Sequence, residues 1–205
     1  VTTQLLSPFK ETKMKIKSII MTSALAMILS SCGSKQAQTK VETSEEPDST
    51  MFVVLNAHTN DSITFTQIDS KRQRTMGYAF AQKQHAIHGT MTDGDTLAVV
   101  PQFKQKRILS SVNYNELVGL WMYESGDGNG MRLDKNGVAS TVGITDNITL
   151  REWKLRNGNF ILTYIKSEGE SYQELADTST IVSLEDSKFV FTLKGKTHTC
   201  YRFDQ

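Results

Sequence analysis

The sequence has few cysteines, no long apolar run and none of the common catalytic patterns. Its 205 residues include only two cysteines, Cys32 and Cys200, which excludes a disulfide-rich scaffold. No apolar stretch approaches the roughly 20 residues that a membrane-spanning helix needs. The nucleophile-elbow, P-loop and zinc-protease patterns are missing as well. We therefore predict that the protein is not an enzyme, and we assign no catalytic residue.

Metal ligands at useful spacings are equally scarce. His85 and His88 would share a face on a helix, but they lie in a β-rich stretch, where residues three apart face opposite sides. Asp127-Gly128-Asn129-Gly130 is similar to the opening of a calcium loop, but Met131 occupies the position of the next oxygen ligand. We predict no metal and no cofactor, and we expect Cys200 to be a buried, unreactive thiol.

The charge is close to balanced. The whole chain has a formal net charge of +1, and without residues 1–31 it has 19 basic and 21 acidic residues, a net charge of −2. Nucleic-acid binding calls for a clearly basic surface, so no nucleic-acid partner is expected. Basic residues gather at 71–74 and 104–107. They fit either a solvated loop and strand edge or a surface that faces anionic lipid or glycan.

The first 31 residues have the pattern of a cleavable signal peptide. Lys13, Lys15 and Lys17 precede an uncharged stretch at 18–29, and small residues follow it. That order of charge, apolar run and small residues is typical of secretory signals. Met14-Lys15 is a natural start of translation, so residues 1–13 are interpreted as an upstream extension.

The segment Leu29-Ser30-Ser31-Cys32 resembles the bacterial lipobox, whose cysteine is acylated after cleavage. Two or three acyl chains anchor a protein far more firmly than one. The prediction is a lipoprotein held by Cys32 on a membrane of the bacterial cell envelope, the outer membrane being favoured. The alternative is an ordinary signal peptide with a cysteine near its end.

A polar segment separates this cysteine from the folded part. Residues 33–50 contain one aliphatic residue beyond alanine, Val41. Such a composition buries too little apolar surface to offset the entropy of ordering. Residues 32–50 are therefore predicted to be the lipidated cysteine and a flexible tether.

The rest of the chain is predicted to be all-β, because short β-rich runs alternate with turn signals. Residues 51–112 are expected to form a small β-barrel of the OB or SH3 kind, with room for a brief helix between 69 and 84. Residues 113–205 are expected to form an antiparallel meander. Asn136-Gly137 and Asn157-Gly158 are typical of two-residue type I′ hairpins.

The start of the meander, Gly119-Leu120-Trp121, resembles the Gly-x-Trp of the lipocalins. In that family a basic residue on the last strand packs on the tryptophan, a place that Arg202 would take here. The layout of lipobox, tether, small β-domain and Leu117-Val118-Gly119-Leu120-Trp121 is similar to the lipocalin-like lipoproteins of Bacteroidetes. The resemblance implies a short lipocalin-like barrel or sandwich, with Gly119, Trp121 and Arg202 at its closure.

The resemblance leaves two functions open. One is a membrane-anchored protein that holds a small hydrophobic or amphipathic molecule inside the meander. Aromatic side chains would then form the cavity walls: Tyr123, Trp153, Phe160, Tyr164, Phe189 and Phe191. The other is a structural or interaction module of the cell envelope that contacts proteins or glycans and holds no small ligand. A small barrel fills its interior with side chains unless its strands are long, so a packed core competes with a cavity.

Overall fold

The computed structural model describes residues 46–144 and 147–203. The predicted signal peptide, the start at Met14, the lipidated Cys32 and residues 33–45 of the tether lie outside these described residues. No helix within them is long and apolar enough to cross a bilayer.

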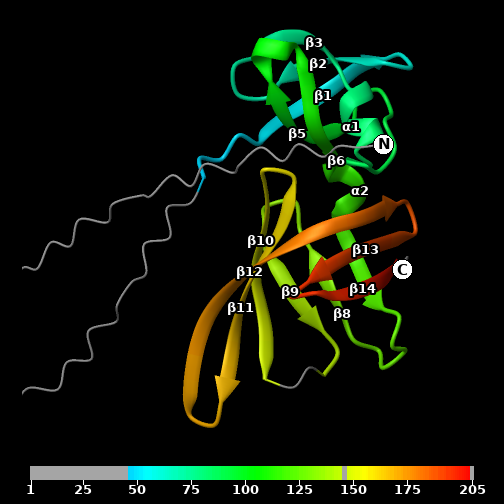
Figure 1. The fold of residues 1–205 in the computed structure, drawn as a ribbon. Helices are drawn as coiled ribbons and strands as arrows, with labels where there is room; N and C mark the ends of the chain where they lie inside the picture. Colours follow the sequence, from blue (N-terminus) through cyan, green and yellow to red (C-terminus); the bar gives the residue numbers. More distant parts are fainter. Residues whose placement is uncertain (1–45, 145–146, 204–205) are drawn as a thin grey trace, which may run out of the picture. The chain divides into compact units, whose positions relative to one another are not determined.

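The first strands close into a small barrel (Figure 1). The elements are β1 (Met51–His58), β2 (Ser62–Gln67), β3 (Gln73–Gly77), α1 (Ala79–Lys83), β4 (Ile87–His88), β5 (Thr96–Gln102), η1 (Phe103–Gln105) and β6 (Arg107–Asn113). The strand order is β3-β2-β1-β5-β6-β4, and a further parallel pairing of β3 with β6 closes a ring of five. A five-stranded closure of this order is that of the OB fold, one of the two predicted types.

Alternation along these strands fills the small barrel. Val53 and Leu55 of β1 and Ile63 and Phe65 of β2 point inward and are buried. Ile108 of β6 joins the same core. The period of two that marked these runs in the sequence therefore places their apolar side chains on one face.

The remaining strands form a second, eight-stranded sheet. Its elements are α2 (Tyr114–Leu117), β7 (Gly119–Tyr123), β8 (Gly130–Leu133), β9 (Ala139–Val142), β10 (Ile148–Arg156), β11 (Asn159–Glu168), β12 (Ser171–Glu185), β13 (Lys188–Leu193) and β14 (Lys196–Arg202). The order is β10-β11-β12-β13-β14-β7-β8-β9, with antiparallel pairs throughout. The sheet curls into a nearly closed barrel, so the all-β prediction is confirmed. Figure 1 shows β11 and β12 as a long hairpin within it.

The two predicted hairpins differ in their turns. Asn157 and Gly158 both have positive φ, at 50° and 80°, as a type I′ turn requires. At the other hairpin Gly137 has a φ of 84°, but Asn136 is not among the residues with positive φ. The Gly137 amide donates to the carbonyl of Asp134 at 3.0 Å, so the chain turns over a longer loop. The prediction of a type I′ turn was therefore wrong for Asn136-Gly137.

Residues 46–50 lie inside the predicted tether but bind the folded part. The Ser49 amide donates to Asn157 Oδ1 at 2.8 Å, and the Asn157 amide donates to Thr50 Oγ1 at 2.7 Å. Asn157 Nδ2 also donates to the carbonyl of Pro47 at 3.2 Å. Hydrogen bonds to Asn157, more than 100 positions away in the sequence, thus hold residues 47–50 against the folded part, although their composition predicted a flexible tether.

Both barrels belong to one compact unit, Glu45–Gln205. Ala98 and Val112, from the first sheet, pack into the core of the second. The Phe52 ring meets Tyr114 edge-on, with ring centroids 5.4 Å apart. The Gly89 amide donates to the carbonyl of Leu184 at 3.0 Å. Apolar burial and backbone hydrogen bonding therefore join the two sheets.

Candidate functional site

The eight-stranded barrel has one incomplete seam, between its edge strands β9 and β10. At one end the seam is joined: the Trp153 amide donates to the carbonyl of Gly137 at 2.8 Å, and Val138 bridges Glu152. Farther along, the amide of Leu150 donates to a side chain, Thr141 Oγ1, at 2.8 Å. The strands therefore separate toward the start of β10.

A cleft of about 670 Å³ lies at the separated end of this seam. Its lining comes from the end of β7 and the loop after it, from β8 to β10, and from the start of β14. The lining residues are Tyr123, Glu124, Ser125, Asn129, Gly130, Thr141, Ile144, Ile148, Leu150, Lys196, Thr197, His198 and Thr199. The cleft is open to solvent, whereas small-molecule sites usually bury most of the ligand's surface.

The two sides of the cleft differ in chemistry. Ile144, Ile148 and Leu150 make one side apolar, and Ile144 is 88% exposed. The start of β14 makes the other side polar, through Lys196 and through His198, which has a threonine on each side. A molecule with an apolar part and a polar part would match both sides at once.

His198 reaches the cleft because alternate residues of β14 face the barrel interior. It pairs across the sheet with Phe191, and the two rings stack with centroids 5.1 Å apart and planes 14° apart. Tyr123, on the neighbouring β7, holds its ring 6.1 Å from that of His198. The cleft therefore has an aromatic floor continuous with the core.

Burial favours the neutral form of both polar rings. It raises the pKa of Tyr123 to about 12, with a smaller contribution from Cys200. Burial, and then the charge of Lys196, lower the pKa of His198. Among the described residues, neither the Tyr123 hydroxyl nor the His198 imidazole has a hydrogen-bond partner. Each can therefore bond to a ligand without breaking a bond within the protein.

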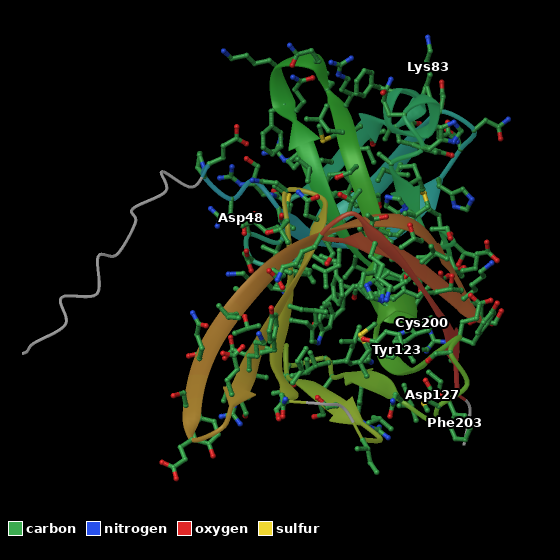
Figure 2. The ribbon with its side chains drawn as sticks, turned by 60° about the horizontal axis from the view of Figure 1, so that its bottom comes forward. Asp48, Lys83, Tyr123, Asp127, Cys200 and Phe203 are labelled. Atoms are coloured by element: carbon green, nitrogen blue, oxygen red, sulfur yellow. The ribbon has the colours of Figure 1, made fainter. Side chains whose placement is uncertain are left out.

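Cys200 lies behind this floor as a free, buried thiol, as the sequence predicted. It pairs across the sheet with Tyr123, and Figure 2 shows the two residues close together in the barrel. Burial raises the pKa of Cys200 to about 12, so the thiol stays protonated. A protonated, buried thiol is a poor nucleophile, and its place here is that of a core residue.

The closure residues meet as the resemblance implied. Arg202 Cζ lies 4.3 Å from the centre of the buried Trp121 ring. Arg202 Nη1 donates to the carbonyl of Val118 at 3.0 Å, and Nη2 donates to the carbonyl of Glu116. Gly119 has a φ of +148°, and a Cβ there would overlap the Arg202 guanidinium. Glycine is thus required where the arginine crosses the first strand.

This arrangement also settles which face of β14 is inside. His198, Cys200 and Arg202 alternate along the inner face, whereas Tyr201 is 42% and Phe203 52% exposed. Tyr201 and Phe203 therefore lie outside the barrel although both are large hydrophobic residues. The Tyr201 hydroxyl instead donates to Glu124 at 3.1 Å on the outer surface.

The six aromatic residues predicted as cavity walls are not brought together. Tyr123 lines the cleft, whereas Trp153 lines another hollow, of about 550 Å³, beside Tyr114. The structure places Phe160, Phe189 and Phe191 in the packed core. Tyr164 donates its hydroxyl to Asp177 Oδ2 at 2.6 Å.

The interior of the barrel is thus packed with side chains, and the open space lies at its end. Sequence reasoning missed the apolar side of the cleft, at Ile148 and Leu150, and the part played by His198. The inward alternation of His198 with Cys200 was the one signal available. Among the described residues, no three His, Cys, Asp or Glu side chains gather as a metal site.

Part of the chain is similar to known proteins. Residues 113–203 match the family described as lipocalin-like. A solved structure of a lipocalin-like protein from Bacteroides thetaiotaomicron is 25% identical over 43% of this chain and 97% of its own, with a TM-score of 0.39. No curated protein matches the sequence.

Proposed function

We propose that residues 113–203, which are lipocalin-like, bind a small amphipathic molecule in the cleft between β9, β10 and β14. We also propose that Cys32 carries lipid and holds this module on a membrane of the bacterial cell envelope. The observation that carries the binding proposal is the cleft itself, with one apolar and one polar side. Its volume of about 670 Å³ is within the usual range of small-molecule sites, about 300–1,000 Å³.

The chemistry of the two sides suggests how the molecule lies. Its apolar part would cover Ile148 and Leu150, which removes their side chains from water at about 25 cal/mol per Å². Its polar part would reach the His198 imidazole and the Tyr123 hydroxyl. Both groups gain a hydrogen bond on binding, since neither has a partner among the described residues.

The packed core limits how deep a ligand can go. Trp121, Phe160 and Phe189 are fully buried and fill the barrel beneath the cleft. The ligand would therefore rest at the mouth of the barrel with one side in contact with water. Such a site favours amphipathic molecules over wholly apolar ones, because an exposed apolar surface gains nothing from binding.

Native mass spectrometry tests this proposal. The full chain in a non-ionic detergent is incubated with a total lipid and metabolite extract, and a discrete adduct that disappears on unfolding is expected. Thr141→Trp, on the inner face of β9, fills the cleft and should abolish the adduct. Thr180→Trp makes the same change at an exposed position of β12 and should leave the adduct intact. Spectra without an adduct across several extracts would refute small-molecule binding.

A further inference from the structure

A second surface lies on the small barrel, at the seam where β3 meets β6. It consists of Arg74, Phe80, Phe103, Lys106 and Arg107, and we call it the arginine–phenylalanine seam. Gly77 pairs with Arg107 there, and the Gly77 amide donates to the carbonyl of Lys106 at 2.9 Å. Barrel closure thus brings together residues from β3, α1, η1 and β6, none of which lines the cleft of the second barrel.

One arginine of this seam lies flat on an exposed ring. Arg107 Cζ is 4.1 Å from the centre of the Phe80 ring, and Arg107 Nε donates to Gln102 Oε1 at 2.7 Å. A cation above a ring face at this distance is attracted by the ring. The ring and the glutamine therefore hold the guanidinium in place. Its two Nη atoms have no hydrogen-bond partner among the described residues.

The other arginine repeats the arrangement. Arg74 Cζ is 4.9 Å from the centre of the Phe103 ring, and Arg74 Nε donates to Gln67 Oε1 at 3.3 Å. Arg74, Phe103 and Lys106 also line a hollow of about 360 Å³. Each arginine thus combines a ring beneath it, a glutamine at Nε and a free outer edge.

The surroundings are basic and lack neutralising partners. Residues 51–110 contain seven Lys and Arg residues, all of them between 71 and 107. None of the seven forms an ion pair within the described part of the chain. Of the four acidic residues between 51 and 110, Asp93 contacts His58, Asp95 accepts from Asn113 and Asp61 accepts from Thr59. The fourth, Asp69, forms no ion pair within the described part of the chain. Positive charge is therefore left for a partner to neutralise.

We propose that the arginine–phenylalanine seam binds a glycan chain that carries phosphate or sulfate groups. The outer edge of a held guanidinium offers two parallel N–H donors, a geometry that matches an oxoanion. The phenylalanine rings, 38% exposed at Phe80 and 48% at Phe103, leave apolar surface on which the C–H face of a sugar ring can pack. Two oxoanion sites on one barrel seam fit a polymer with repeated anionic groups.

The order in this surface argues for a discrete ligand over a membrane. Attraction to an anionic bilayer requires only basic charge near the surface, and mobile lysines supply it well. Here two arginines are each held in place by a phenylalanine ring and a glutamine. Attraction to the charge of a membrane surface does not require side chains in fixed positions. The inference is independent of the cleft, so either proposal can fail without the other.

Fluorescence anisotropy measures the proposed binding. The full chain in a non-ionic detergent is titrated against two labelled probes, a heparin-derived octasaccharide and a phosphorylated oligomannose. The matched probes without sulfate or phosphate should not bind. Arg74→Gln with Arg107→Gln should weaken binding about tenfold or more, since two charge-assisted contacts are lost.

Two further double variants separate a site from general electrostatics. Arg132→Gln with Arg151→Gln makes the same change in charge on exposed positions of β8 and β10, and should weaken binding less than about twofold. Phe80→Leu with Phe103→Leu leaves the net charge unchanged and should weaken binding about threefold, because the rings no longer hold the arginines. Circular dichroism melts confirm that each variant is folded.

Three results would overturn the proposal. One is equal weakening by the two arginine double variants, which would mean that net charge alone matters. Another is failure of the unmodified chain to bind either anionic glycan. The third is stronger competition by anionic phospholipid vesicles or single-stranded DNA than by the glycans, at equal concentration of negative charge.

Discussion

Arg202 should be the most important polar side chain for the stability of the second barrel. It holds the last strand to the first through the Trp121 ring and the carbonyls of Glu116 and Val118. Its Nε also donates to the carbonyl of Asp186. Arg202→Ala removes all of these contacts and leaves three carbonyls to find other donors.

The expected cost follows from these contacts. A hydrogen bond from a charged donor contributes about 1.5–3 kcal/mol, and a cation–π contact about 0.5–2 kcal/mol. Arg202 is half-buried, so water can reach the vacated carbonyls and reduce the loss. We expect the free energy of unfolding to fall by about 3 kcal/mol, which for a chain of this size lowers Tm by roughly 6–12 °C.

Urea unfolding followed by tryptophan fluorescence measures this change, since Trp121 lies directly beneath the arginine. Arg132→Ala, on the exposed side of β8, is the control and should cost less than about 0.5 kcal/mol. A loss under about 1 kcal/mol for Arg202→Ala would refute the assigned contacts.

Gly119 provides a second, independent check of the same geometry. Gly119→Ala should destabilise the protein through its φ of +148° and through overlap with the Arg202 guanidinium. In the Arg202→Ala background the overlap is gone and only the backbone strain remains. The two changes should therefore cost less together than the sum of their separate costs. Additive costs would mean that the two residues are not in contact.

Three further predictions concern other parts of the chain. Burial raises the pKa of Cys200 from 9.0 to about 12, so folding favours its neutral thiol. This contribution to the free energy of unfolding is complete below pH 9 and should be lost as the pH rises toward 12. Urea titrations across this pH range measure the loss, and Cys200→Ser is the control. Asn157→Gly keeps the positive φ but removes the side-chain hydrogen bonds to Pro47 and Ser49. The free energy of unfolding should fall by about 1–2 kcal/mol, and proteolysis before residue 50 should become faster. Unchanged proteolysis would contradict these contacts. Cys32→Ala should move the protein from the membrane fraction to the soluble fraction and abolish labelling by radioactive palmitate; membrane retention would disprove the anchor.

Local chemistry was enough to predict much of the second barrel. Asn157-Gly158 forms the type I′ turn because both residues tolerate positive φ, a property independent of the surroundings. Alternation placed apolar residues such as Phe160 and Leu162 on one face of β11. Gly119 and Trp121 could be paired with Arg202 because the resemblance to a family supplied the long-range contact, which the strand pattern alone does not contain.

Only the tertiary structure decided where the open space lies. The cleft exists because β9 is short and its edge separates from β10. The residues of a strand do not by themselves determine its length or the distant strand with which it pairs. The arginine–phenylalanine seam likewise depends on one parallel pair between β3 and β6. Sequence determined which residues could be inside, because alternation is local. Barrel closure determined which of them meet, because contacts between distant strands depend on register and curvature throughout the sheet.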